Sequence, residues 1–125
     1  MARYYADTYA LVEILRGNPA YEKYASGELV ASEFNLLELA YALTRDYGKE
    51  KAVEILKIVR AFITIVKPTD KDYAEASALR IELKKQSKNL SLIDALGYTI
   101  AKRLRIPFLT GDREFKKLDN VEYVK

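Results

Sequence analysis

Short apolar runs alternate with amphipathic helical segments along this chain, and this alternation limits the fold more than any other feature of the sequence. The helical segments show apolar residues at intervals of three and four positions. Between them lie five short predicted strands: Arg3–Ala6, Leu29–Ala31, Phe62–Val66, Pro107–Leu109 and Val121–Val124. Strands that alternate with helices in this way are typical of an α/β domain with a largely parallel sheet.

The helical periodicity has clear starts and stops, because small polar residues, glycines and prolines bound each segment. The predicted helices run from Thr8 to Gly17, Pro19 to Gly27, Ser32 to Gly48, residues 49–61, Thr69 to Lys85 and Ser91 to Leu104, with a short one after Asp112. The segments 32–48 and 49–61 are expected to form an antiparallel hairpin. In the first of them the residues predicted to face inward are Phe34, Leu37, Leu39 or Ala40, and Leu43. At 125 residues the whole chain, 1–125, is expected to be one domain.

The composition excludes several kinds of catalysis. The chain has no cysteine and no histidine, which rules out disulfides, thiolate metal ligands, imidazole ligands and histidine general bases. Catalysis would have to use carboxylates, lysines, hydroxyls, tyrosines or a bound metal. We expect a cytoplasmic protein with no membrane partner, since Asp7 interrupts the early apolar run and no stretch approaches the roughly 20 apolar residues of a membrane span.

Four acids are predicted to meet at one edge of the sheet. Asp7 follows the first strand, and Asp112 follows the apolar stretch from Ile106 through the turn at Gly111. Glu38 lies early in the helix after the second strand, and Asp94 lies in the first turn of the helix that begins at Ser91. In parallel sheets the starts of strand-following helices gather at the carboxyl edge, where ligands bind.

Each acid also has an ordinary structural interpretation. Asp7 and Asp112 can cap helices. Ser91 and Asp94 have the spacing of a capping box, and Asn35 with Glu38 has a weaker version of it. Two observations favour a metal site. Asp94 and Glu38 each stand among apolar neighbours, where an unpaired carboxylate is costly. With no nitrogen or sulfur ligands, the cluster suits a hard cation such as Mg²⁺ or Mn²⁺.

These segments resemble the PIN domain and, in size and layout, the VapC-type toxin ribonucleases of prokaryotic toxin–antitoxin pairs. The matching elements are Tyr-Ala-Asp7-Thr8, Asn-Leu-Leu-Glu38-Leu, Leu-Ser-Leu-Ile-Asp94-Ala and Phe-Leu-Thr-Gly-Asp112-Arg-Glu-Phe, and the resemblance covers essentially the whole chain. It implies a three-layer α/β/α sandwich around a short-stranded sheet. It also implies that Asp7, Glu38, Asp94 and Asp112 bind metal, that the Thr8 and Thr110 hydroxyls support the site, and that Glu114 lies near a further acidic position.

The same resemblance implies a function. One or two Mg²⁺ or Mn²⁺ ions would activate water for the hydrolysis of RNA phosphodiesters. An antitoxin protein would restrain the enzyme, and a homodimer is expected. The helices from Thr8 to Tyr24 and the hairpin 32–61 offer apolar surface for a partner, although such stripes also form cores.

Basic residues and tyrosines leave two interpretations open. The basic candidates for an RNA track are Lys102, Arg103, Arg105, Arg113, Lys116 and Lys117, which could equally form a solvated face. Tyrosines could stack on bases, or pack in the core.

Two rival functions remain open. A non-catalytic PIN-like scaffold would bind RNA or a partner without cleaving, which an intact set of four acids disfavours. A Mg²⁺-binding phosphoacceptor domain would carry paired acids after the first strand, where this chain has Asp7 alone.

Overall fold

The computed structural model describes residues 2–125 and shows a five-stranded parallel sheet with helices on both faces. The strands are β1 (Arg3–Ala6), β2 (Glu28–Ala31), β3 (Ile63–Ile65), β4 (Phe108–Thr110) and β5 (Val121–Tyr123). They are arranged in the order β3-β2-β1-β4-β5, and every neighbouring pair is parallel. The predicted α/β class with a parallel sheet is therefore confirmed.

The helices follow the predicted order with small changes at their ends. They are α1 (Thr8–Leu15), α2 (Glu22–Ala25), α3 (Glu33–Tyr47), α4 (Lys49–Phe62), α5 (Asp70–Lys85) and α6 (Leu92–Leu104), with the 3₁₀ turns η1 (Pro19–Tyr21) and η2 (Arg113–Phe115). Phe62, which we predicted to open a strand, ends α4. The segment after Asp112 is a single 3₁₀ turn. None of the helices within residues 2–125 has the length and hydrophobicity that crossing a membrane requires.

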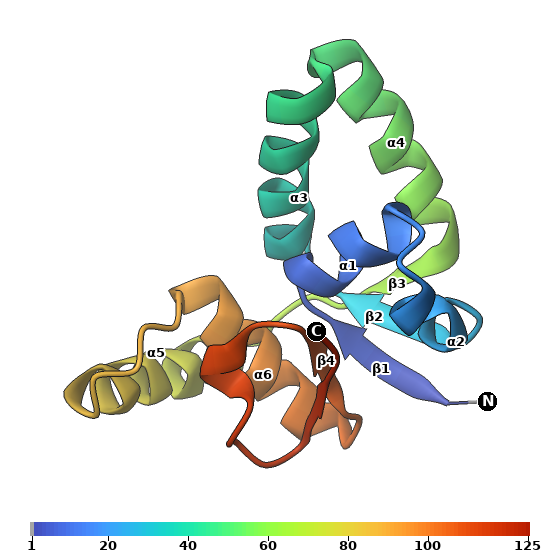
Figure 1. The fold of residues 1–125 in the computed structure, drawn as a ribbon. Coiled ribbons are helices and arrows are strands. Elements are labelled where there is room, and N and C mark those ends of the chain that lie inside the picture. The colour runs from blue at the N-terminus through green and yellow to red at the C-terminus, as the bar shows by residue number, and fades with distance from the viewer. Residues whose placement is uncertain (1) are drawn as a thin grey trace.

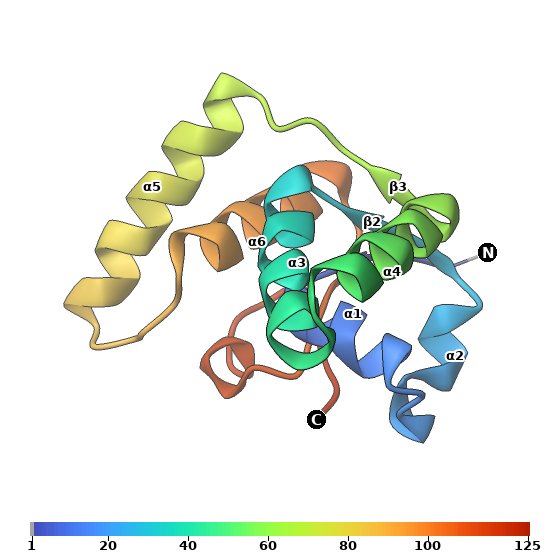
Figure 2. The ribbon, with the colours of Figure 1, turned by 90° about the horizontal axis from the view of Figure 1, so that it is seen from above.

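Successive side chains of each strand point to opposite faces of the sheet, so the buried residues form two cores, one on each face. Tyr5, Val30 and Phe108 belong to the core beneath α5 and α6. Their neighbours Ala6, Leu29 and Leu109 belong to the core shared with α1, α3 and α4. Figure 1 shows the α3–α4 hairpin rising from one side of the sheet and α6 crossing the other, with α5 outside it, and Figure 2 shows the same layers from above. The three-layer arrangement is thus confirmed.

The inner face of α3 differs from the prediction. Leu36, Leu39 and Leu43 are buried, whereas the side chain of Leu37 is 66% exposed. Leu36 and Leu37 are both apolar, so each could belong to a row of apolar residues at helical spacing. Which of the two rows is buried depends on how α3 packs on the sheet. Leu37 therefore belongs to the outer surface.

Candidate active site

Asp7 lies where β1 ends and α1 begins, and its side chain is almost fully buried. Its Oδ1 accepts a hydrogen bond of 2.8 Å from the backbone N–H of Ala10, so it caps α1. Its Oδ2 accepts a hydrogen bond of 2.5 Å from the hydroxyl of Thr110, at the end of β4. Since β1 and β4 are neighbours at the point where strand order reverses, the fold brings these distant residues together.

Asp112 follows β4 and is half-buried. Its Oδ1 accepts a hydrogen bond of 3.0 Å from the backbone N–H of Glu114, and its own N–H donates to the Thr110 hydroxyl over 3.0 Å. Thr110 thereby joins Asp7 to Asp112. Gly111 between them does not have a positive φ. A Cβ there would overlap the ring of Tyr9 and come within 2.6 Å of the carbonyl oxygen of Val124, so the glycine allows close packing and not an unusual turn.

Asp94 stands in the first turn of α6 and forms the predicted capping box with Ser91. The Ser91 hydroxyl accepts from the Asp94 N–H over 3.0 Å, and Asp94 Oδ2 accepts from the Ser91 N–H over 3.3 Å. Its neighbour Leu92 is exposed, whereas Ala95 and Leu96 are buried, so only part of the apolar segment around Asp94 packs in the core.

Glu38 reaches the site through Thr8. The Thr8 hydroxyl donates a hydrogen bond of 2.7 Å to Glu38 Oε1, which links the start of α1 to α3. The expected Asn35–Glu38 capping pair is wrong: the capping box at the start of α3 pairs Ser32 with Asn35. Sequence reasoning assigned Asn35 to that pair and therefore missed its hydrogen bond to Thr8, over 3.3 Å.

Two of the acids, Asp7 and Asp94, have raised pKa values because they are partly or fully removed from water and lie near other acids. Burial raises the pKa of Asp7 to about 7, and the charges of Asp94 and Asp112 add to the rise although the hydrogen bonds from Thr110 and Ala10 oppose it. Burial also raises the pKa of Asp94, with further contributions from the charges of Glu38 and Asp112. The four predicted acids thus act on one another electrostatically. A bound cation would relieve this repulsion.

A cavity of about 480 Å³ opens beside these residues. Its walls include Asp7, Asp94, Asp112 and Glu114, together with the positive side chains of Arg113 and Lys125 and with Tyr9, Gly111 and Tyr123. Glu38 does not line it. Tyr9, Tyr123 and Lys125 were not foreseen, because no motif marks them and only the folded sheet brings them to the cavity.

The donor set fits a hard cation. Within residues 2–125 no three acidic side chains form a ready-made cage for one ion. Mg²⁺ does not require such a cage, because it usually binds through one or two carboxylates and keeps several waters. Carboxylate oxygens around a roomy cavity meet this requirement.

The predicted basic residues divide into two groups. Lys102 pairs with Asp119 over 3.1 Å, and Arg103 binds the buried carboxylate of Asp72 through two contacts of 2.9 Å, so these two support the fold. Lys116 lies over the ring of Tyr123. Of the six candidates, Arg113 is the one whose side chain lines the acidic cavity.

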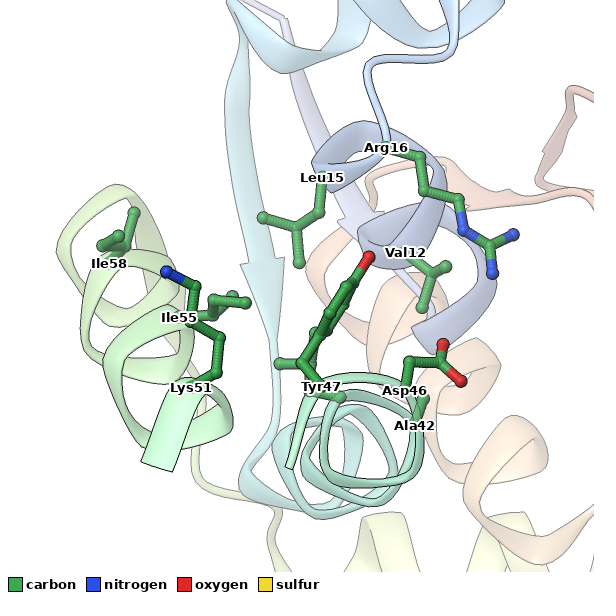
Figure 3. Close-up of a pocket in the computed structure, with 10 residues that line it drawn as sticks. Val12, Leu15, Arg16, Ala42, Asp46, Tyr47, Lys51, Ile55 and Ile58 are labelled. Carbon is green, nitrogen blue, oxygen red and sulfur yellow. The ribbon is translucent and has the colours of Figure 1, made fainter. Parts of the chain in front are cut away.

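A second cavity of about 300 Å³ separates α1 from the α3–α4 hairpin. Figure 3 shows Val12 and Leu15 of α1 facing Ile55 and Ile58 of α4 across it, with Tyr47 between them. Arg16, Asp46 and Lys51 lie at its polar margin. The structure thus contains the apolar groove that the sequence suggested between these segments.

Comparison with known proteins gives consistent results. The PIN domain family profile matches residues 4–121, while the search of curated proteins finds no match. Similar solved structures include VapBC-1 from nontypeable Haemophilus influenzae, with a TM-score of 0.77 and 17% identity over 98% of this chain and 97% of that one. The sarcin–ricin loop cleaving toxin VapC20 from Mycobacterium tuberculosis has a TM-score of 0.76 and 17% identity, over 98% of each chain.

VapBC2 from Rickettsia felis, solved with a DNA fragment from its promoter, has a TM-score of 0.74 and 21% identity, over 98% of this chain and 97% of that one. At these identities the solved structures establish a shared fold. The family profile spans nearly the whole sequence, from β1 to the start of β5. The chain therefore belongs to the PIN domain family.

Proposed function

We propose that this protein is a metal-dependent endoribonuclease that hydrolyses RNA phosphodiesters, and that it acts as the toxin of a VapBC-type pair. The observation that carries the proposal is the meeting of Asp7, Asp94 and Asp112 around one cavity, in a chain without histidine or cysteine. The solved VapC20 toxin, described as cleaving the sarcin–ricin loop, has the same fold. The proposed cofactor is Mg²⁺ or Mn²⁺.

The protein's own residues have distinct tasks in this reaction. Asp7, Asp94 and Asp112 would hold the cation at the cavity, and Glu38, which lies outside the cavity wall, would be a further ligand from α3. When bound, the cation supplies Lewis-acid charge and lowers the pKa of water. Arg113 and Lys125 lie on the cavity wall, where they offset the negative charge that would otherwise repel RNA phosphates. Glu114 lines the same wall and is exposed, and we propose it as an additional ligand.

Cleavage of labelled RNA with Mg²⁺ or Mn²⁺ tests the assignment, using the wild type and Asp94→Asn. Asp70→Asn is a matched control, because Asp70 also lies in the first turn of a helix but far along the chain from the cavity residues. We expect cleavage to fall by about 100-fold or more in Asp94→Asn and to remain in the control. Equal cleavage by both variants would overturn the proposal. RNA binding without cleavage by the wild type would favour a non-catalytic scaffold.

We further propose that the apolar groove between α1 and the α3–α4 hairpin receives a segment of the antitoxin. Related structures are toxin–antitoxin complexes, and Val12, Leu15 and Ile55 offer apolar contacts with charged Arg16 and Lys51 at the margin. An amphipathic helix with acidic residues opposite Arg16 and Lys51 and a basic residue opposite Asp46 matches this surface.

Co-expression with the antitoxin tests the groove. Ile58, at the groove, and Ile81, on α5, are both 60% exposed and form a matched pair. Ile58→Asp should weaken antitoxin binding by about tenfold or more without changing RNA cleavage, whereas Ile81→Asp should leave binding unchanged. Equal antitoxin binding by the two variants would exclude the groove.

A homodimer is proposed at a different apolar surface. Phe34, Tyr73 and Leu92 line a cavity of about 230 Å³ between α3, α5 and α6, and the exposed Leu37 and Tyr41 continue it along α3 at helical spacing. A second copy would cover this surface. Light scattering should give a dimer for the wild type and a monomer for Leu37→Glu, and a monomeric wild type at micromolar concentration would exclude it.

A further inference from the structure

A line of polar side chains runs from the buried sheet to Glu38. The hydroxyl of Tyr5, on β1, donates a hydrogen bond of 2.5 Å to Asn35 Oδ1. Asn35 Nδ2 donates to Thr8 Oγ1 over 3.3 Å, and Thr8 Oγ1 donates to Glu38 Oε1 over 2.7 Å. Tyr5 and Asn35 are buried, whereas Thr8 and Glu38 are half-buried. The chain of bonds therefore leads from the interior to Glu38, whose charge acts on the proposed cation ligand Asp94.

The direction of these bonds is fixed by the backbone. The N–H of Ser32 points at Asn35 Oδ1 over 3.2 Å, and a backbone N–H can only donate. The oxygen of the Asn35 amide must therefore face Ser32 and Tyr5. Its NH₂ group then faces Thr8, and since an amide nitrogen only donates, it occupies a lone pair of the Thr8 hydroxyl.

The hydroxyl of Thr8 has a single proton, and this proton is left to point at Glu38. We propose that Asn35 is a positioning residue of the active site: it orients the Thr8 hydroxyl so that Thr8 holds Glu38 Oε1, and Glu38 Oε2 stays available to the cation. Oε2 receives no hydrogen bond from any residue in 2–125. The inference rests on the proposed metal-dependent function and assigns Asn35 a role in it.

The replacement Asn35→Asp tests this role, because the added charge and the lost hydroxyl orientation should change the cation affinity in opposite directions. The carboxylate has the shape of the amide, and one of its oxygens still accepts hydrogen bonds from Ser32 and Tyr5. Its second oxygen replaces the NH₂ group that donates to Thr8, so an acceptor now faces the Thr8 hydroxyl. The Thr8 proton then turns away from Glu38. Added negative charge alone would tighten cation binding, whereas loss of the oriented hydroxyl weakens it, by about 10- to 100-fold for supporting residues of metal ligands.

The measurement is the Mn²⁺ dissociation constant of the purified protein without RNA, by calorimetry, alongside RNA cleavage and the melting temperature. We expect weaker Mn²⁺ binding in Asn35→Asp and Thr8→Val, and near wild-type binding in Thr8→Ser, which keeps the hydroxyl. Asn89→Asp, at an exposed position, is the isosteric charge control and should bind Mn²⁺ as the wild type does. If Asn35→Asp does not fold, Thr8→Val and Thr8→Ser still test the hydroxyl contact to Glu38 on which the role of Asn35 depends, and equal Mn²⁺ binding by these two variants would overturn it.

The outcomes separate this inference from the proposed function. Mn²⁺ binding and RNA cleavage by the wild type, with unchanged or tighter Mn²⁺ binding in Asn35→Asp, would overturn the role of Asn35 alone. A lower melting temperature with unchanged Mn²⁺ affinity would also overturn it, because that is the result for a purely structural residue. Absence of both Mn²⁺ binding and cleavage in the wild type would overturn the proposed function and this inference together.

Discussion

Asp7 combines a helix cap with an unfavourable charge. It satisfies the N–H of Ala10 and accepts from Thr110, yet burial and the neighbouring acids raise its pKa to about 7. A carboxyl whose pKa is raised on folding destabilises the folded state when it is ionised. This loss of folding free energy is absent below about pH 4, the pKa of the carboxyl in the unfolded chain, and grows as the pH rises toward 7. Without a cation, Asp7 thus lowers stability at neutral pH.

Asp7→Asn should therefore stabilise the metal-free protein. The amide keeps an oxygen for the Ala10 N–H and removes the buried charge, so we expect a gain on the order of 2–4 kcal/mol at pH 8 that shrinks toward pH 4. Urea unfolding in EDTA at the two pH values measures this. Added Mg²⁺ should stabilise the wild type more than the variant. A variant less stable than the wild type at pH 8 would contradict the expected charge effect.

Helix α6 packs closely on the sheet because residue 97 is a glycine. Gly97 faces the sheet, where an added Cβ would lie 2.7 Å from the ring of Tyr5 and 3.1 Å from that of Phe108. Both rings are fully buried and cannot move aside freely. Because Asp94 lies one turn before Gly97 on the same helix, the packing of α6 on β1 and β4 sets the distance from Asp94 to Asp7.

Gly97→Ala should lower both stability and activity. Overpacking of this kind costs about 1–3 kcal/mol, and outward movement of α6 would carry Asp94 away from the cavity. We expect a loss of RNA cleavage of about tenfold or more at a temperature where the variant remains folded by circular dichroism. Ala78, exposed on α5, allows a control in Ala78→Gly, which should lose stability without losing cleavage. Unchanged cleavage by Gly97→Ala would show that the helix position is not critical.

Patterns among neighbouring residues predicted the helices and strands well, but they predicted less well which side chains are buried or paired across the fold. Ser91 and Asp94 marked the start of α6 because a capping box is a contact within four consecutive residues. The exposure of Leu37 could not be read, since it depends on how α3 lies over the sheet. The ion pair of Arg103 with Asp72 joins residues on different helices, so no local pattern separates Arg103 from the other basic candidates.

The same limit applies to the site. The sequence predicted that Asp7, Glu38, Asp94 and Asp112 meet at one edge of the sheet, because parallel sheets gather strand ends there. Three of these acids line one cavity and Glu38 does not. The strand rule did not apply directly to Asp94, because its helix follows a polar loop. The role of Thr8 between Asn35 and Glu38 was not readable. It depends on hydrogen-bond directions between two helices, which no spacing rule encodes.

Across the whole molecule, a net charge of +3 is distributed unevenly. Arg113 and Lys125 stand beside the acids, while Arg103 and Lys102 are engaged in ion pairs. RNA binding should therefore weaken as monovalent salt rises, with a slope set by the few cations at the cavity and not by the full basic content.

Arg113→Ala should change the salt dependence of RNA binding, whereas Arg103→Ala should change the stability of the fold. Removal of one phosphate contact lowers the slope of log K against log salt by about 0.7 for single-stranded RNA, which we expect for Arg113→Ala. Arg103→Ala should keep the slope and lower stability, because it leaves the buried carboxylate of Asp72 unpaired. Fluorescence anisotropy in the Asp94→Asn background, where RNA stays intact, measures the slopes. Equal slopes for both variants would remove Arg113 from the RNA contacts.

The hydrogen bond from Thr110 to Asp7 joins residues 103 positions apart. Asp7 is therefore synthesised well before its partner strand β4. Until β4 docks beside β1, a growing chain holds Asp7 without Thr110 or Asp112, and the cavity does not exist. Such long-range pairing forms late in folding. Under the proposed function, the site cannot act until β4 has been made and has docked beside β1.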